Sequence, residues 1–336
     1  MANPESNYSL GVDIGGTKVA AGLVSAEGEI LTTVRVPMVA DGDAAAGLGA
    51  VEAAIGGIFA ERPTETAAER LSGIGICAPG PLDPVSGVVL NPPNLPCWRN
   101  FPLAAEIHRR FGLIAHVDND ANAAGLAETL WGAAQGFRSV FYATLGTGIG
   151  TGIVLDGRIY HGRTGSAGEG GHVTIDFRGP QCACGKRGCI EALASGPAIA
   201  QRARERLAVP RPSKSKILEL AGGDPARISA EIVGEAFRKG DALASEVLLE
   251  TADLLAVWLG DVINLLEPEV IVFGGGVAAL MSAFFGHLRA QLPRWSYNQR
   301  CQEIPLLLAR YGADAGIAGA AALCAKSPEP LNHSVA

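Results

Sequence analysis

A repeated pattern of strands punctuated by glycine pairs constrains the fold of this chain more than any other feature of its sequence. Residues 8–36 alternate apolar runs with Gly-Gly and Glu-Gly turns at hairpin spacing, which predicts a meander of three strands. The pattern restarts at 140–162, and the match extends to detail: Gly22-Leu23-Val24 and Glu27-Gly28-Glu29-Ile30 recur as Gly152-Ile153-Val154 and Asp156-Gly157-Arg158-Ile159. Such similarity within one chain indicates the internal duplication of one α/β unit.

Each meander carries a glycine-rich tip between its first two strands. Exposed N–H groups, a hydroxyl and a carboxylate at the first tip suit phosphates and their magnesium; they come from Asp13, Gly15, Gly16, Thr17 and Lys18. The second tip holds Gly146, Thr147 and Gly148. Residues 11–18 swap the last two letters of a P-loop, and residues 146–150 do not fit G-x-G-x-x-G. Two phosphate-facing hairpins are therefore predicted, with a plain turn as the alternative for the first.

Composition places the chain among soluble, loop-rich globular proteins. Its 336 residues suffice for two domains, with 48% hydrophobic residues, 18% charged residues and 44 glycines. The formal net charge of -7 argues against a general nucleic-acid binder. The first ten residues show no basic region followed by an apolar one, and no apolar run reaches the length of a membrane span. We therefore expect a cytoplasmic protein with no nucleic-acid or membrane partner.

Polar residues follow a predicted strand at a position where α/β sheets usually carry function. The apolar strand at 113–117 leads into Asp118, Asn119 and Asp120, which open a helical run. These side chains are candidates for a functional site. Asp118 could equally be only the N-cap of the helix.

A later strand, beginning at Val270, ends in three glycines before another helix: Gly274, Gly275 and Gly276. A nucleotide base or ribose could approach the backbone closely there, because glycine has no side chain. Tight packing alone is an equal alternative for these glycines.

The densest group of reactive side chains lies between Gly165 and Glu191. Cys182, Cys184 and Cys189 fall within eight residues, with His172 ten positions upstream. Three thiolates and one imidazole make a complete, closed set for a structural Zn²⁺, and Gly185 and Gly188 permit the tight turns it needs. A disulfide with one spare thiol, or buried apolar cysteines, are the alternatives. No chemistry is assigned to the scattered Cys77, Cys97, Cys301 and Cys324.

A zinc-bound His172 would present its other ring N–H as a fixed donor. Glu169 and Glu191 flank the cysteines and supply acceptors. Donors and acceptors held together in this way suit a polyhydroxylated ligand.

Five motifs lie in order along nearly the whole chain: DIGGTK at 13–18, NDANAA at 119–124, LGTGIGTG at 145–152, GEGGH at 168–172 with CACGKRGCIE at 182–191, and FGGGV at 273–277. Together they resemble the ROK family of repressors, open reading frames and sugar kinases. The resemblance implies an α/β, two-domain actin-like ATPase fold (hexokinase/ribonuclease H-like) with duplicated βββαβα units. ATP and sugar would bind in the cleft between two lobes that close on sugar. The expected lobes are 1–120 plus about 312–336, and 121–311 with the zinc-bearing loop at 165–191.

The resemblance also implies roles for single residues. Asp120 would be the catalytic base, and the sugar would be held by Gly80, Asn119, Asp120, Glu169, His172 and Glu191. Zn²⁺ would be bound by His172, Cys182, Cys184 and Cys189. ATP and Mg²⁺ would lie at the two tips and at the glycines 274–276. Gly170 replaces the aliphatic residue usual in the family, a departure expected to loosen the loop while leaving the ligands intact.

The expected reaction is the ATP-dependent phosphorylation of a hexose hydroxyl. Such a hydroxyl is too weakly acidic to attack phosphorus readily, so a carboxylate that accepts its proton is needed. Residues 78–84 and 91–98 look more like the glucokinases of the family than its N-acetylmannosamine kinases, which favours D-glucose and the product glucose 6-phosphate. An N-acetylmannosamine kinase or a fructokinase is the alternative. ATP or polyphosphate remains open as the donor.

A non-catalytic sugar-binding sensor is the alternative from another class. Repressors of the family carry an extra N-terminal helix-turn-helix region, whereas about seven residues precede the first strand here, so the chain looks like a kinase. By resemblance we expect a homodimer or a dimer of dimers.

Overall fold

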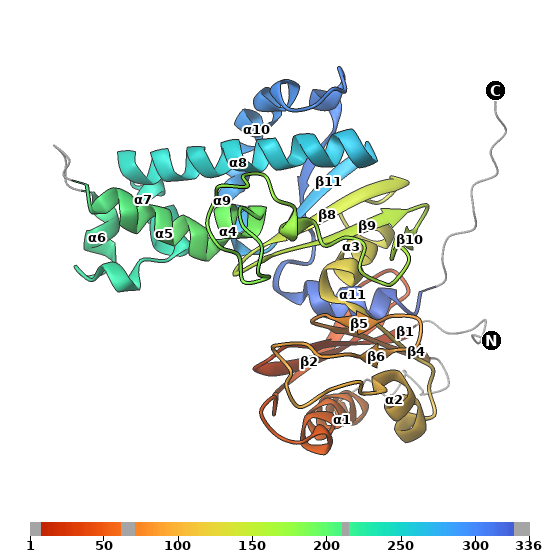
Figure 1. Cartoon of the computed structure of the whole chain (residues 1–336). Helices are drawn as coiled ribbons and strands as arrows, with labels where there is room; N and C mark the ends of the chain where they lie inside the picture. Colours follow the sequence, from red (N-terminus) through yellow and green to blue (C-terminus); the bar gives the residue numbers. More distant parts are fainter. Residues whose placement is uncertain (1–7, 62–70, 210–214, 326–336) are drawn as a thin grey trace, which may run out of the picture. The chain divides into compact units, whose positions relative to one another are not determined.

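The chain forms two five-stranded sheets that share one strand order. Residues 8–61, 71–209 and 215–325 are described by the structure, which is a computed structural model (Figure 1). The first sheet has the order β3-β2-β1-β4-β7, from the strands β1 (Tyr8–Ile14), β2 (Lys18–Ser25), β3 (Ile30–Pro37), β4 (Leu71–Ala78) and β7 (Ala115–Asn119). Strands β1, β2 and β3 pair antiparallel as the predicted meander, and β1, β4 and β7 pair parallel.

The second sheet has the order β10-β9-β8-β11-β12, which repeats the arrangement of the first sheet. Its strands are β8 (Ser139–Leu145), β9 (Ile149–Leu155), β10 (Arg158–Ile159), β11 (Val270–Gly274) and β12 (Leu306–Leu308). In both sheets a meander forms one edge and the later strands extend the other. The order of the strands supports the duplication predicted from the sequence.

Strand β7 differs from its prediction in one useful respect. It begins at Ala115 rather than Leu113, because helix α2 (Leu103–Phe111) ends at Gly112 in the left-handed conformation (φ 69°) before the chain turns into the sheet. It also runs on to Asn119, so that Asp118 lies within the strand. The polar residues predicted to follow the strand are therefore partly inside it.

Helices cover both faces of the first sheet. Helix α1 (Ala44–Glu61) packs on β2 and β3, and α2 packs on β7. Helices α3 (Asp120–Leu130) and α11 (Ala315–Ala322) pack against each other, and α11 lies on β1 and β4 (Figure 1). A side chain at Gly75 would collide with the Ala320 carbonyl oxygen 1.7 Å away, so glycine is what lets α11 lie so close to the sheet.

The long apolar helix α1 belongs to the core of this sheet. Val51, Ile55 and Ile58 are almost completely buried, and each such side chain contributes about 1.5–3 kcal/mol when removed from water. By length and composition α1 is the one described helix that meets the criteria for a membrane span. The expectation that no apolar run reaches this length was therefore wrong. A core helix passes the same test, and the buried side chains of α1 identify it as one.

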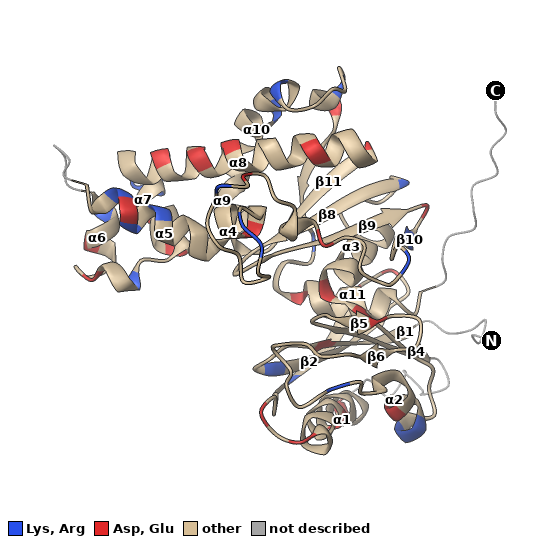
Figure 2. Ribbon diagram, in the orientation of Figure 1, with Lys and Arg blue, Asp and Glu red and all other residues tan. Residues whose placement is uncertain are grey.

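The remaining helices gather around the second sheet's β11 and around one long helix. They are α4 (Ile190–Ala194), α5 (Gly196–Leu207), α6 (Lys216–Leu220), α7 (Ala230–Arg238), α8 (Ala242–Leu266), α9 (Gly276–Met281) and α10 (Phe285–Gln291). Helix α8 packs against α4, α5, α7 and α10. Acidic residues recur along its length (Figure 2), and one of them, Glu250, pairs with Arg202 and Arg206 of α5.

Two compact units divide the chain. Unit 1 comprises Met1–Tyr142, Gly152–Gly168 and Ala309–Ala336, and unit 2 comprises Ala143–Thr151 and Glu169–Leu308. Residues 121–142 and 152–168 thus belong with the first sheet by this division. The lobe boundaries expected from the sequence, 1–120 with about 312–336 and 121–311, stay a prediction.

Candidate functional site

A row of polar side chains crosses the first sheet at its carboxyl end. Asp13 of β1 is in register with Cys77 of β4, and Cys77 is in register with Asp118 of β7. The Cys77 thiol lies 3.4 Å from Asp13 Oδ1 and donates toward it. Burial raises the pKa of Asp13, an effect that Cys77 and the nearby cations Lys18 and Arg35 partly offset.

Asp120, just beyond the end of β7, also acts electrostatically on Cys77. The pKa of Cys77 is raised well above its ordinary value, first by burial and then by the negative charges of Asp13, Asp120 and Asp118. These carboxylates therefore lie near enough to the buried thiol for their negative charges to act on it.

The junction between β7 and α3 fixes the orientation of Asn119 and Asp120. Asn119 is the N-cap of α3: its Oδ1 accepts hydrogen bonds from the amides of Ala121 (2.9 Å) and Asn122 (3.4 Å). Asp120 Oδ1 accepts from the Ala121 amide at 2.8 Å, and the Asp120 side chain is exposed. A Cβ built on Gly80 would lie 3.9 Å from Asn119 Nδ2, so the predicted sugar residues Gly80, Asn119 and Asp120 lie close together in unit 1.

The alternative for Asp118 as an N-cap was wrong, because Asn119 takes that place. Asp118 is buried, and its Oδ1 accepts from the Asn119 amide (2.7 Å) and from Asn122 Nδ2 (3.1 Å). Its Oδ2 lies 2.6 Å from Nε2 of His161. The hydrogen bond with Asp118 raises the pKa of His161, against the opposing effect of burial. Through these hydrogen bonds Asp118 stabilises the end of β7, where Asn119 and Asp120 follow.

His161 was not singled out from the sequence. It lies in the loop after β10, 43 residues from its partner, and no spacing motif connects the two. The pair borders a cavity of about 280 Å³ within unit 1, whose lining also includes His116 and Arg158.

The first tip is a tight turn within unit 1. The Gly15 amide donates to the Lys18 carbonyl at 2.9 Å, and the Met38 amide donates to the Thr17 carbonyl at 3.0 Å. A Cβ on Gly16 would come within 2.9 Å of the Asn94 carbonyl oxygen, so the segment 91–98 passes directly over this tip. Gly15 and Thr17 are thereby held while the Lys18 side chain stays exposed.

The second tip is built in the same way and meets the triple glycine. The Gly146 amide donates to the Gly148 carbonyl at 2.9 Å, and the Gly146 carbonyl accepts from the Gly196 amide at 2.8 Å. Gly275 has a φ of 85°, and a Cβ there would lie 2.4 Å from the Leu145 carbonyl oxygen. The close packing that the sequence left open for residues 274–276 thus holds for Gly275, which lies against the end of β8 beside the second tip.

Glu191 is anchored to the second tip by a backbone amide. Its Oε2 accepts from the Ile149 amide at 2.9 Å, and a Cβ on Gly148 would lie 2.6 Å from the same oxygen. Its Oε1 is 3.9 Å from Nδ1 of His172. Glu191 therefore lies between the second tip and the Cys/His residues, all within unit 2.

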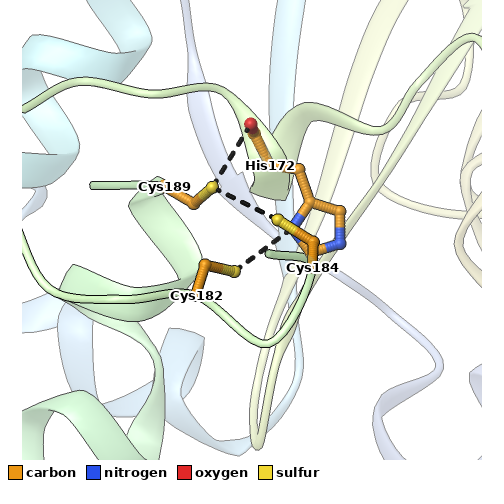
Figure 3. Close-up of side chains that lie close together, drawn as sticks. All are labelled: His172, Cys182, Cys184 and Cys189. Carbon is orange, nitrogen blue, oxygen red and sulfur yellow. Dashed lines mark hydrogen bonds between the residues drawn. The ribbon is translucent and has the colours of Figure 1, made fainter. Parts of the chain in front are cut away.

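The four predicted metal ligands converge in space (Figure 3). Nδ1 of His172 and the sulfurs of Cys182, Cys184 and Cys189 all lie within 4.8 Å of one another. Cys182 Sγ is 3.7 Å from His172 Nδ1, and the sulfurs of Cys184 and Cys189 are 3.7 Å apart. Bonds of about 2.3 Å from sulfur to a tetrahedral zinc would place two thiolates about 3.8 Å apart. The donor set and its spacing fit Zn²⁺.

The loop around this cluster turns where the glycines allow it. Gly185 and Gly188 have φ values of 91° and 67°, and a Cβ on Gly188 would overlap the Asp176 carbonyl oxygen. Burial raises the pKa of Cys182 to about 12, whereas a backbone hydrogen bond near Lys186 lowers that of Cys184. A bound metal would have to displace the proton of the buried thiol.

Glu169 precedes a single turn of 3₁₀ helix, Gly170–His172, and His172 is the last residue of that turn. Glu169 is exposed, and His172 directs Nδ1 toward the cysteines, so that Nε2 is the ring nitrogen left to face other groups (Figure 3). This geometry agrees with a His172 that ligates through one nitrogen and donates through the other. Glu169, His172 and Glu191 thus come together in unit 2.

Comparison with known proteins shows the family to which this set of motifs belongs. Residues 9–327 match the ROK family. The chain belongs to the ROK family. It is 36% identical to a glucokinase of Thermotoga maritima over 94% of this chain and 96% of the relative. A ROK family glucokinase from Streptomyces griseus, solved with glucose and AMPPNP, superposes with a TM-score of 0.78 at 35% identity, over 94% of this chain and 98% of that one.

The family also contains proteins of another class with the same fold. A ROK family transcriptional regulator, a homolog of an Escherichia coli protein, superposes with a TM-score of 0.81 at 31% identity, over 94% of this chain and 77% of that one. The actin-like ATPase fold expected from the sequence is thereby confirmed. Fold alone does not separate the two classes, so activity must be argued from the residues of the site.

Proposed function

We propose that this protein is an ATP-dependent hexose kinase that converts D-glucose to glucose 6-phosphate. The observation that carries the proposal is Asp120: an exposed carboxylate, oriented by the first turn of α3, directly after β7 and beside Asn119 and Gly80. The glucokinase relatives, which are similar over nearly the whole chain, support the same activity.

Asp120 acts as the general base in this proposal. The carboxylate accepts the proton of the attacking sugar hydroxyl as the bond to the γ-phosphorus forms and the bond to the leaving ADP oxygen breaks. A general base of this kind accelerates a reaction by about 10²–10⁴-fold. Asn119, Glu169, His172 and Glu191 hold the remaining sugar hydroxyls, and the Gly80 backbone approaches the sugar.

In this proposal the glycine-rich segments bind the nucleotide and its magnesium. We assign ATP to the first tip (Asp13, Gly15, Gly16, Thr17, Lys18), the second tip (Gly146, Thr147, Gly148) and residues 274–276. Mg²⁺ neutralises the phosphates when bound, and the carboxylate of Asp13 is the acidic group of the first tip. A hydrogen bond from the Gly15 amide closes the first turn and one from the Gly146 amide closes the second, so the other residues of both tips need little further ordering to receive phosphate oxygens.

We assign a structural Zn²⁺ to His172, Cys182, Cys184 and Cys189. All four places are taken by protein atoms, so the ion leaves no position for water and its contribution is to fix the loop. That loop carries His172 and leads into Glu191. The metal therefore acts on the sugar indirectly, by holding two of its ligands in place.

A panel of sugars tests the function. ADP release with ATP and Mg²⁺ is measured for glucose, mannose, fructose, N-acetylglucosamine and N-acetylmannosamine, and the sugars are ranked by kcat/KM. Glucose is expected to lead. An N-acetylated sugar or fructose in first place would replace the substrate, and no ADP release with any sugar from zinc-replete protein would favour the sensor. Cytoplasmic localisation, and a homodimer or dimer of dimers, stay predictions.

A further inference from the structure

The turn that carries Glu169 and His172 is held by two buried side chains that the proposed mechanism does not use. The Gly170 amide donates to Thr151 Oγ1 at 2.8 Å, and the Gly170 carbonyl accepts from Nε1 of Trp258 at 3.1 Å. Thr151 is 4% exposed and Trp258 is fully buried. The N–H and the C=O of Gly170 are thus both hydrogen-bonded to side chains, one from β9 and the other from α8.

The same turn fits against β9 without room for a side chain. A Cβ on Gly171 would lie 1.9 Å from the Ile149 carbonyl oxygen. A Cβ on Gly170 would lie 2.7 Å from Thr151 Oγ1 and 3.2 Å from its Cγ2. The hydroxyl and methyl of Thr151 therefore occupy the space that a larger side chain at position 170 would need. All of these residues belong to unit 2.

Strand β9 thereby holds both halves of the sugar-facing set of unit 2. Its Ile149 amide binds Glu191 Oε2, and two residues further on Thr151 binds the turn between Glu169 and His172. The departure at Gly170 does not leave the turn loose, since Thr151 and Trp258 fix it from opposite ends of the residue.

We propose that Thr151, together with Trp258, is a positioning residue for the sugar: it holds the Gly170–His172 turn so that Glu169 and His172 are preorganised for the hexose hydroxyls. The proposal rests on the proposed function for its substrate. Neither side chain has to touch the sugar. Loss of the Thr151 hydroxyl takes this acceptor away from the Gly170 amide, a part-buried donor, so the turn loses one of the two side-chain hydrogen bonds that hold it.

The first test compares Thr151→Val with Thr151→Ser. Valine keeps the branched shape without the acceptor, and serine keeps the acceptor without the methyl. T151V is expected to raise the KM for the sugar about tenfold with kcat within about twofold, and T151S to stay within about threefold of wild type in both. A T151V enzyme with wild-type KM, or one whose kcat falls as far as its KM rises, would overturn the proposal.

Amide hydrogen exchange gives a readout that does not depend on activity. The Gly170 amide is expected to exchange at least about tenfold faster in T151V than in wild type, and at a near wild-type rate in T151S. Equal rates in all three proteins would contradict the assignment. If the wild-type chain phosphorylated no hexose, the proposed function would fail, whereas the exchange rates would still decide whether Thr151 holds the turn.

A double-mutant cycle tests the shared volume. Gly170→Ala is expected to raise the sugar KM when Thr151 is present, because the new methyl displaces the hydroxyl. In a Thr151→Ala background only the Cβ of residue 151 remains, 3.4 Å away, so the same change is expected to add less than about twofold. Additive effects would show that the two positions do not compete for space.

Discussion

The first and second hairpins have the same plan, yet they hold different chemical groups. In the first hairpin, the strand before the tip contributes a carboxylate, Asp13, which lies in register with Cys77 and near Asp118 and Asp120. In the second, the strand after the tip contributes a backbone amide and a hydroxyl, which bind Glu191 and the turn that carries Glu169 and His172. A duplicated framework thus offers the same positions twice, and the two copies present different groups beside their tips.

The comparison implies a division of kinetic effects. Changes beside the first hairpin should act on kcat, because they remove groups that meet the phosphates or the moving proton. Changes beside the second should act on the sugar KM, because they release groups that hold the substrate. Variants from either region test this expectation, because a change beside the first hairpin that acts on the sugar KM, or one beside the second that acts on kcat, would contradict it.

The largest effect is expected from Asp120→Asn. An amide cannot accept the hydroxyl proton, so kcat should fall about 10²-fold or more while sugar affinity stays within several-fold. Steady-state kinetics with the preferred sugar provide the measurement, and Asp224→Asn, at an exposed cap on a surface turn, is the matched control. Near-normal turnover in D120N would remove Asp120 from the mechanism.

The second prediction addresses the metal. Cys184→Ala should lose bound zinc and raise the sugar KM by about 50-fold or more, because the loop that holds His172 and leads into Glu191 is no longer fixed. Metal content and kinetics are measured on the same preparation. Cys301→Ala, a buried cysteine outside the cluster, should keep its zinc. An active, zinc-free C184A protein would refute the structural role of the metal.

A smaller effect is expected at the second tip. Gly148→Ala places a methyl 2.6 Å from Glu191 Oε2 and should raise the sugar KM about tenfold with little change in kcat. Gly286→Ala in α10 is the control, since no atom lies within 4 Å of the Cβ it would add. If both variants changed KM equally, the contact with Glu191 would not be the cause.

The smallest effect concerns His161. Its pKa is raised above about 6.5 in the folded protein, so protonation favours the folded state. The stabilisation is complete below about pH 6.5 and is lost as the pH rises through the folded-state pKa. The free energy of unfolding of wild type should exceed that of His161→Gln by up to about 1 kcal/mol more near pH 5.5 than near pH 8.5.

Urea unfolding at the two pH values checks this expectation. His116→Gln, from the same cavity lining, is the control for the removal of an imidazole. A constant difference between wild type and H161Q across the range would mean that the hydrogen bond to Asp118 acts without a change of charge.

The sequence predicted the features that depend on local patterns. Glycine pairs at hairpin spacing predicted both meanders, and the spacing of His172 and the three cysteines predicted a cluster that the structure brings within 4.8 Å. The alternative of an N-cap at Asp118 was one residue early, because Asp118, Asn119 and Asp120 are all good caps in isolation. Only the register of β7, which buries Asp118, decides among them.

Features that depend on distant residues could not be predicted in this way. His161 and Asp118, or Thr151, Gly170 and Trp258, meet only because of the tertiary fold, and each of these residues alone is unremarkable in sequence. Gly170 was expected to loosen its loop, since a missing side chain usually removes packing. Its two hydrogen bonds to buried side chains could be found only from the structure.

The close packing of α11 on the first sheet bears on the order in which the protein is made. This helix is the last one described in the chain, and it lies on β1 and β4, among the earliest strands. Unit 1 is therefore assembled from the two ends of the chain, whereas most of unit 2 is a continuous stretch, Glu169–Leu308. During synthesis on the ribosome, the face of the first sheet on which α11 packs stays without this helix until residues 315–322 have left the ribosome. Unit 2 has all its residues earlier, which makes the nascent first sheet the stage of biosynthesis most exposed to aggregation and chaperone capture.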